Sequence, residues 1–277
     1  IEAVIEAGGH IVVVADYDAD GATACAIAVR GLRMFGASVS FVVPNRFTDG
    51  YGLSPSLVDR ALAQNPALIV TVDNGIAAIA GVDAANARGV PVVVTDHHLA
   101  GDELPKAAAI VNPNQPGCTF PSKNLAGCGV MFYVLITLRR RYRERGDPRG
   151  AAPLNTLFDI LALGTVADVV QLDRNNRLLV AAGLARMHRG MACPGIRHLF
   201  RVSGRTLEAA GAIDLGFYIG PRINAAGRMD DASVGIRCLI TDDEAEAAEL
   251  ADALDQTNTL RKTVQADIQE EAEELAE

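Results

Sequence analysis

The sequence is poor in aromatic residues and has no long apolar run. Tryptophan is absent, and aromatic side chains make up 5% of the 277 residues, which limits the base stacking that the chain can offer to a nucleic acid. No apolar run reaches the roughly 18 residues that span a bilayer, and residues 1–4 lack the basic start of a signal peptide. We therefore expect a protein of the cytoplasm with no membrane partner.

Cysteine is also scarce. The five cysteines are an odd number and no pair has the CxxC spacing. This pattern argues against a disulfide framework and against a structural zinc site, and it favours a reducing compartment. We expect each cysteine to be a small buried apolar residue.

Two further function classes lack their signature. The formal net charge of −9 argues against a broad non-specific nucleic-acid binder, which would be basic. It leaves a nuclease open, because carboxylates that hold cations are themselves acidic. No GxGxxG run follows the first predicted strand, which argues against an NAD-type dinucleotide-binding domain.

Short β-branched runs alternate with alanine-rich stretches in the first half of the chain. The runs span residues 11–14, 39–43, 68–72, 90–95 and 108–111, and the helix candidates span 22–35, 55–64, 76–88 and 127–145. Because the runs are apolar throughout, they are typical of parallel strands buried on both faces. The pattern predicts an α/β fold: a doubly wound, mostly parallel sheet with helices on both faces.

The second half is expected to be mainly helical. We predict a sheet domain over residues 1–180 and a mostly helical extension over 181–241 that contains a glycine- and proline-punctuated loop at 220–227. A long connecting helix over 242–277 would lead to a further C-terminal domain. Because the sequence starts without methionine and stops inside this helix, we expect a fragment of a longer protein.

Acidic and imidazole residues follow three of the predicted strands, and one more carboxylate follows a later helix. Ligand sites in such sheets lie beyond the C-terminal strand ends. The candidates are Asp16, Asp18, Asp20, Asp73, His97, His98 and Asp168. Oxygen and imidazole ligands without thiolates suit Mn²⁺ or Mg²⁺. Two such ions can activate water for attack on a phosphoryl group.

Each candidate has a simpler structural explanation when taken alone. An aspartate before a helix is commonly an N-cap, and a lone histidine is commonly structural. Taken together, these groups would repel one another unless cations lie between them. An EF-hand is excluded because the twelfth position is Val29 when Asp18 is counted first, or Ile27 when Asp16 is.

Four ordered motifs resemble those of the DHH phosphoesterase superfamily. They are Asp16-Tyr17-Asp18-Ala19-Asp20-Gly21, Asp73-Asn74-Gly75, Asp96-His97-His98 and Gly164-Thr165-Val166-Ala167-Asp168. Two further segments are similar to RecJ-like exonucleases and not to the inorganic pyrophosphatases of the superfamily. They are Pro44-Asn45-Arg46-Phe47-Thr48-Asp49-Gly50-Tyr51-Gly52-Leu53 and Ile219-Gly220-Pro221-Arg222-Ile223-Asn224-Ala225-Ala226-Gly227-Arg228-Met229.

The resemblance implies a role for each motif residue. Asp18 would bind one metal and Asp20 the other, and Asp73 would bridge them. His97 and Asp168 would complete the second site, and Asp16 would be a direct ligand or support one. His98 would contact the scissile phosphate or lie beside the metals, and Asp96 would orient a histidine. Catalytic roles thus fall to Asp73, His97 and His98.

Substrate contacts are expected from the two RecJ-like segments. Arginine forks suit phosphate oxygens, so Arg222, Arg228 and Arg46 are candidate phosphate ligands together with Asn224. Tyr51 is a candidate for stacking on a base. The alternative for Arg222 is a structural pair with Asp214 or Asp230, and the alternative for Arg46 and Tyr51 is an ordinary capped loop.

The resemblance also implies an activity. It predicts a hydrolase with two divalent cations, Mn²⁺ before Mg²⁺, that degrades single-stranded DNA from the 5′ end to nucleoside 5′-monophosphates in DNA repair and recombination. Single-strand-binding protein and a helicase would be partners of the full-length protein. Many superfamily members have a histidine at the position of Val14, so the first metal would bind more weakly here, or would take water or Asp16 instead.

Two alternatives stay open from the sequence. One is a nano-RNase or cyclic-dinucleotide phosphodiesterase of the same superfamily. The other is a non-catalytic DHH-like replication scaffold, which the nearly complete ligand set disfavours.

Overall fold

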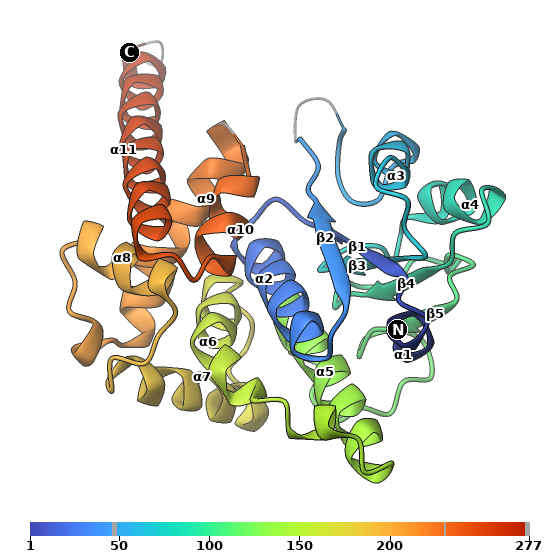
Figure 1. The fold of residues 1–277 in the computed structure, drawn as a ribbon. Helices are drawn as coiled ribbons and strands as arrows, with labels where there is room; N and C mark the ends of the chain where they lie inside the picture. Colours follow the sequence, from blue (N-terminus) through green and yellow to red (C-terminus); the bar gives the residue numbers. More distant parts are fainter. Residues whose placement is uncertain (46–48, 230, 275–277) are drawn as a thin grey trace.

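A computed structural model describes residues 1–45, 49–229 and 231–274, and its centre is a five-stranded parallel sheet (Figure 1). The strands are β1 (His10–Ala15), β2 (Ser38–Val42), β3 (Leu68–Val72), β4 (Val92–Thr95) and β5 (Ala109–Val111). Their order is β2-β1-β3-β4-β5, and each neighbouring pair is parallel. The predicted doubly wound parallel sheet is confirmed.

Eleven α-helices are described. They are α1 (Glu2–Glu6), α2 (Ala19–Met34), α3 (Pro55–Leu62), α4 (Ile79–Ala87), α5 (Gly127–Glu144), α6 (Phe158–Ala167), α7 (Arg174–Met187), α8 (Pro194–Val202), α9 (Gly220–Met229), α10 (Ser233–Ile240) and α11 (Glu244–Glu274). Short 3-10 turns and a π-helical stretch (Asp214–Ile219) lie between α5 and α9. No helix among the described residues is both long enough and apolar enough to cross a membrane.

Helices cover both faces of the sheet. Alternate strand residues point to opposite faces and pack against the helices on each. Val12 and Val14 of β1 pack in a small core with residues of α3 and α4. Ile11 and Val13 of the same strand belong to a larger core that includes α2, α5 and α6. In Figure 1 the pair α3 and α4 lies on the opposite side of the strands from α2 and α5.

The strand order creates the position of the site. From β1 the chain moves to β2 on one side, and β3 then returns to the other side of β1. The loops that leave the carboxyl ends of β1 and β3 therefore diverge, and they open a crevice of the kind in which open α/β sheets bind ligands. The acidic residues that follow β1 and β3 both lie at this crevice.

The long C-terminal helix is present as α11, and its two halves differ. Its first half is buried through Ala247, Leu250 and Leu254 and packs against α8, α9 and α10. Further along, Leu260 and Ile268 are exposed. The predicted boundary at residue 180 falls inside α7, so the division into three parts stays a prediction.

The predicted loop at 220–227 is wrong, because these residues form most of α9. Pro221 lies two residues after the π-helical stretch (Asp214–Ile219) that runs directly into α9, where the regular i to i−4 hydrogen bonding is already interrupted. Gly227 serves close packing, since a Cβ at this position would lie 1.9 Å from the carbonyl oxygen of Tyr17. The glycine that suggested a loop therefore brings α9 against the acidic turn after β1.

Candidate metal centre

The end of β1 supplies two neighbouring carboxylates. Asp16 is 3% exposed, and its Oδ1 accepts a hydrogen bond from the Tyr17 N–H at 2.7 Å. Asp18 caps α2, and its Oδ1 accepts from the Gly21 N–H at 2.8 Å. A Cβ at Gly21 would lie 2.5 Å from the Asp16 carbonyl oxygen. A tight, glycine-dependent turn thus holds both carboxylates beside the strand end.

Asp20 reaches from α2 to the start of α5. Its oxygens accept backbone hydrogen bonds from Gly127 at 2.5 Å and from Cys128 at 3.0 Å. Because the N-cap of α5 makes no side-chain hydrogen bond, Asp20 provides the acceptor that the first turn of this helix needs. The sequence does not predict this contact, since Asp20 and Gly127 are 107 residues apart.

Asp73 follows β3 in a left-handed backbone conformation with φ of 61°. A non-glycine residue in this region costs on the order of 1–3 kcal/mol and needs support from its surroundings. Asn74 provides part of it, because its Nδ2 donates to the carbonyls of Val14 at 3.1 Å and Val72 at 2.9 Å. The Asp73 N–H donates to Thr95 at 3.0 Å. Strands β1, β3 and β4 together fix this aspartate.

Asp96 holds the two histidines that follow it. Its Oδ1 accepts from the N–H groups of His97 and His98 at 2.7 and 3.1 Å and from His98 Nδ1 at 2.7 Å. Its Oδ2 accepts from the Ile76 N–H at 2.9 Å. The hydrogen bond to Asp96 raises the pKa of His98. Asp96 therefore fixes the ring of His98, as its predicted role requires.

Two asparagines after β5 hold the same histidine pair from behind. Asn114 Nδ2 donates to the His97 carbonyl at 2.6 Å, and Asn112 Nδ2 donates to the His98 carbonyl at 2.9 Å. Asn112 is 1% exposed. Neither residue is among the candidates predicted from the sequence, although the Asn-Pro-Asn run directly after the fifth strand is a signal for them.

The predicted ligands come together at one point. Three groups have ligand atoms within 4.8 Å of one another: Asp16, Asp18 and Asp73; Asp73, His97 and His98; Asp20, His97 and Asp168. His97 Nε2 lies 3.0 Å from Asp73 Oδ1, 3.6 Å from Asp168 Oδ2 and 3.8 Å from Asp20 Oδ2. The last ligand, Asp168, is the C-cap of α6.

The polar atoms that face the middle of this cluster are not satisfied by protein. Asp73 Oδ1, His97 Nε2 and Asp168 Oδ2 are buried and make no hydrogen bond within the described chain. Buried polar groups are normally paired, and carboxylate and imidazole atoms that converge in this way suit hard or borderline divalent cations. The residues present therefore fit a metal centre.

The raised pKa values of the carboxylates also indicate a metal centre. Burial, reinforced by Asp18, raises the pKa of Asp16 to about 7. Burial, reinforced by Asp20, raises the pKa of Asp168 to about 8. Burial and the negative charge of Asp20 raise the pKa of Asp73 well above its usual range. Without cations the cluster holds protons, and cations would take their place.

Tyr51 lies over the rim of the cluster. It is 54% exposed, its ring meets those of Tyr17 and His98 edge-on at 6.3 and 6.1 Å, and its hydroxyl lies 3.5 Å from His98 Nε2. The side chain is therefore accessible beside the site. Arg46, the other candidate of this segment, lies outside the described residues.

Arg222 makes a structural pair, but with a different partner from those expected. Its Nε and Nη2 lie 2.9 and 2.7 Å from Asp255 Oδ1, and its Nη1 donates to the Tyr218 carbonyl at 2.6 Å. Of the expected partners, Asp214 pairs with Arg205 at 2.6 Å and Asp230 lies outside the described residues. The Arg222–Asp255 pair joins α9 to α11.

Asn224 makes an internal contact, whereas Arg228 is exposed. Asn224 Oδ1 accepts from the Ala19 N–H at 2.8 Å, so it supports the turn between Asp18 and Asp20. Arg228 is exposed on α9. Val14 is fully buried in the core under α3 and α4 and offers no ligand atom.

Acidic and imidazole side chains gather at the β1/β3 crevice of a parallel sheet. This combination defines the class of this protein. Residues 10–165 match the DHH family, N-terminal domain, and the chain belongs to this family.

Curated relatives extend the similarity over nearly all of the chain. It is 54% identical over 275 residues to the single-stranded-DNA-specific exonuclease RecJ of Salmonella typhimurium, and 52% identical over 275 residues to that of Escherichia coli. Each alignment covers 98% of this chain and 48% of the relative. The chain thus spans about half the length of these relatives.

Solved structures agree with the fold. A crystal structure of exonuclease RecJ bound to manganese has a TM-score of 0.85 at 38% identity, and the match covers 96% of this chain and 66% of that one. RecJ of Thermus thermophilus in complex with Mg²⁺ has a TM-score of 0.69 at 33% identity and covers 96% and 34%.

Proposed function

We propose that this chain is the catalytic core of a metal-dependent phosphodiesterase that degrades single-stranded DNA from its 5′ end to nucleoside 5′-monophosphates, in DNA repair and recombination. The observation that carries the proposal is the set of buried, unsatisfied atoms of Asp73, His97 and Asp168 that face one another. Relatives named as single-stranded-DNA-specific exonucleases supply the substrate.

The ligands would divide between two cations. Asp20, His97 and Asp168 would hold one, and Asp16 and Asp18 the other. Asp73 belongs to a group on each side and would bridge them. Mn²⁺ is the expected ion and Mg²⁺ the second choice, since related structures carry these metals. Bound there, the cations would acidify a water and polarise the phosphoryl oxygens.

The protein side chains would orient the phosphate. His98, whose pKa is raised by the hydrogen bond to Asp96, would donate a hydrogen bond to a phosphoryl oxygen. Because Asp96 occupies Nδ1, the opposite atom Nε2 would serve the substrate.

Strand contacts would come from around this centre. Tyr51 would stack on a base. Arg222, Asn224 and Arg228 would bind backbone phosphates together with Arg46, although Arg222 and Asn224 also make the internal contacts described above. Such contacts fix the register of a strand without selecting its sequence.

Three expectations rest on the resemblance alone. Single-strand-binding protein and a helicase are proposed as partners of the full-length protein, and the cytoplasm is its proposed location.

The test is Mn²⁺-dependent degradation of a 5′-labelled single strand by wild type, Asp73→Ala and Asp83→Ala. Asp83 is an exposed aspartate on α4 and serves as the matched control. We expect loss of activity in Asp73→Ala alone. Equal degradation by all three proteins would refute the bridging role.

A second comparison separates the alternatives within the family. Wild type is offered the long single strand and a dinucleotide at equal concentration of phosphodiester bonds. Preference for the long strand supports the exonuclease, whereas preference for the dinucleotide favours a nano-RNase or cyclic-dinucleotide phosphodiesterase. Binding without hydrolysis of either favours a scaffold.

A further inference from the structure

A pocket of about 510 Å³ opens directly beside the metal cluster. Its walls come from three segments: residues 51–55 before and at the start of α3, residues 75–81 after β3 and in the first turn of α4, and Asp96, His98 and Leu99 after β4. The pocket therefore shares His98 with the cluster and lies on the α3 and α4 side of the sheet.

The walls are neutral and mostly apolar. Leu53, Ile76, Ile79 and Leu99 line the pocket together with alanine and glycine residues. Among the residues that line it, the groups that carry charge are Asp96 and His98, and they are hydrogen-bonded to each other. A phosphate would find no unpaired cation there, whereas pockets of this size and polarity suit a flat, largely apolar ligand.

The rim offers aromatic and aliphatic contacts, and the start of α4 has no side-chain cap. Tyr51 and Leu99 are 54% and 83% exposed at the mouth, so an aromatic face and an aliphatic side chain are open to contact. The N-cap of α4, Ala78, makes no side-chain hydrogen bond; the Ile79 N–H donates to the Ala77 carbonyl at 3.0 Å, and Ala78 offers no side-chain acceptor to the remaining first-turn N–H groups.

We propose that this pocket, which we call the α4 pocket, binds the sugar and base of a nucleotide joined to the scissile phosphate. The inference rests on the proposed function and extends it to a subsite. His98 belongs both to the cluster and to the pocket wall, so a nucleoside attached to a phosphate held at His98 would lie at the pocket.

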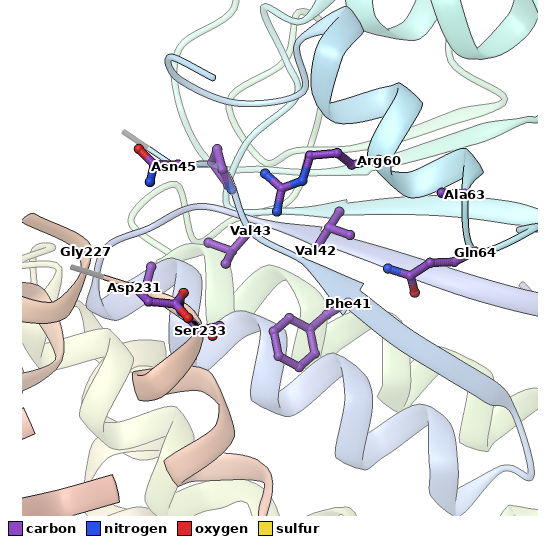
Figure 2. A pocket seen from close by; sticks show the side chains of 12 residues that line it. Phe41, Val42, Val43, Asn45, Arg60, Ala63, Gln64, Gly227, Asp231 and Ser233 are labelled. Carbon is purple, nitrogen blue, oxygen red and sulfur yellow. Dashed lines mark hydrogen bonds between the residues drawn. The ribbon is translucent and has the colours of Figure 1, made fainter. Parts of the chain in front are cut away.

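A different cleft, of about 650 Å³, lies between β2, the end of α3 and the junction of α9 with α10 (Figure 2). Its charged groups already have partners: Arg60 pairs with Asp49 at 2.6 Å, and Asp231 accepts from Ser233. Figure 2 shows Arg60 and Asp231 on opposite walls. Because these walls carry opposite, satisfied charges and share no side chain with the metal cluster, the α4 pocket is the better nucleoside site.

The test fills the pocket without touching the metal ligands. Ala80 is exposed and lines the pocket in the first turn of α4, and Ala87 is exposed in the last turn of the same helix outside it. Ala80→Trp and its matched control Ala87→Trp are compared with wild type. Binding of thymidine 5′-monophosphate and of inorganic phosphate is measured by calorimetry in the presence of Mn²⁺.

We expect Ala80→Trp to bind thymidine 5′-monophosphate at least tenfold more weakly than wild type, with phosphate binding unchanged, and Ala87→Trp to match wild type for both. Equal nucleotide binding by all three proteins, or a parallel loss of phosphate in Ala80→Trp, would overturn the proposal. If the expected binding pattern occurs in a protein that hydrolyses no phosphodiester, the proposed function fails and the subsite stands.

Discussion

The carboxylate of Asp20 accepts two hydrogen bonds from the first turn of α5, at Gly127 and Cys128. Gly127 also lies against the centre itself, since a Cβ there would sit 2.6 Å from Asp73 Oδ1. One glycine thus contacts two proposed metal ligands, Asp20 of α2 and Asp73 after β3.

Gly127→Ala should therefore disable the centre. The new methyl group must displace Asp73, and a misplacement of about 1 Å at a catalytic group can cost about 100-fold in rate. Gly101→Ala is the control, because a Cβ at Gly101 meets nothing within 4 Å. Hydrolysis of single-stranded DNA in Mn²⁺ measures the effect, and similar rates for the two variants would contradict this account of the glycine.

Asn114→Ala should weaken metal binding without unfolding the chain. The variant frees the His97 carbonyl, and loss of a residue that orients a metal ligand typically costs about 10- to 100-fold in affinity. Asn86→Ala is the control, because Asn86 makes the same kind of amide-to-carbonyl bond, to Lys106, at an exposed position. Calorimetric titration with Mn²⁺ should separate the two variants, and equal affinities would argue against the positioning role.

The stability of the metal-free protein should fall as the pH rises. The pKa values of Asp16 and Asp168 are raised to about 7 and about 8, so between about pH 4 and pH 8 the folded chain holds protons that the unfolded chain has released. Stability therefore declines with pH over this window.

Divalent cations should reverse this dependence, because they replace the protons. Thermal unfolding at pH 6, 7 and 8 in EDTA and in Mn²⁺ measures both effects. We expect the stabilisation by Mn²⁺ to grow with pH. A gain in Tm that shrinks from pH 6 to pH 8 would be incompatible with proton release from these carboxylates.

Asp255→Ala should destabilise the packing of α11. The substitution leaves Nε and Nη2 of the largely buried Arg222 guanidinium without their carboxylate acceptor, at a cost of about 1–3 kcal/mol. Asp252→Ala is the control on the same helix, because Asp252 pairs with Arg201 where both side chains are about half exposed, and such pairs contribute at most about 1 kcal/mol. In urea unfolding, Asp255→Ala should lose more stability than Asp252→Ala. The reverse order would show that Arg222 does not depend on Asp255.

The sheet could be predicted from the sequence because its strands are short, apolar and regularly spaced. Most of the candidate ligands could be placed together because they follow those strands, and parallel strands bring their carboxyl ends to one edge, whereas Asp168 follows helix α6. The sequence predicts a loop where α9 lies, since Gly220, Pro221 and Gly227 are individually unfavourable in helices. What allows them is tertiary packing, such as the contact of Gly227 with the Tyr17 carbonyl.

Partners from distant segments could not be predicted. The contacts of Asp20 with α5, of Asn224 with Ala19 and of Arg222 with Asp255 join residues that share no local pattern. The supporting residues Asn112 and Asn114 are harder to recognise for a different reason. Their side chains bind backbone carbonyls and take no direct part in metal binding.

The most direct test of the central claim is the number of manganese ions that the chain binds. Anomalous diffraction from crystals grown in Mn²⁺ should show two ions among the ligands of the cluster, with the Asp73 carboxylate between them, and Asp73→Ala should lose at least one of them. A single ion that does not contact Asp73, or no ion in the cluster at all, would contradict the two-metal account.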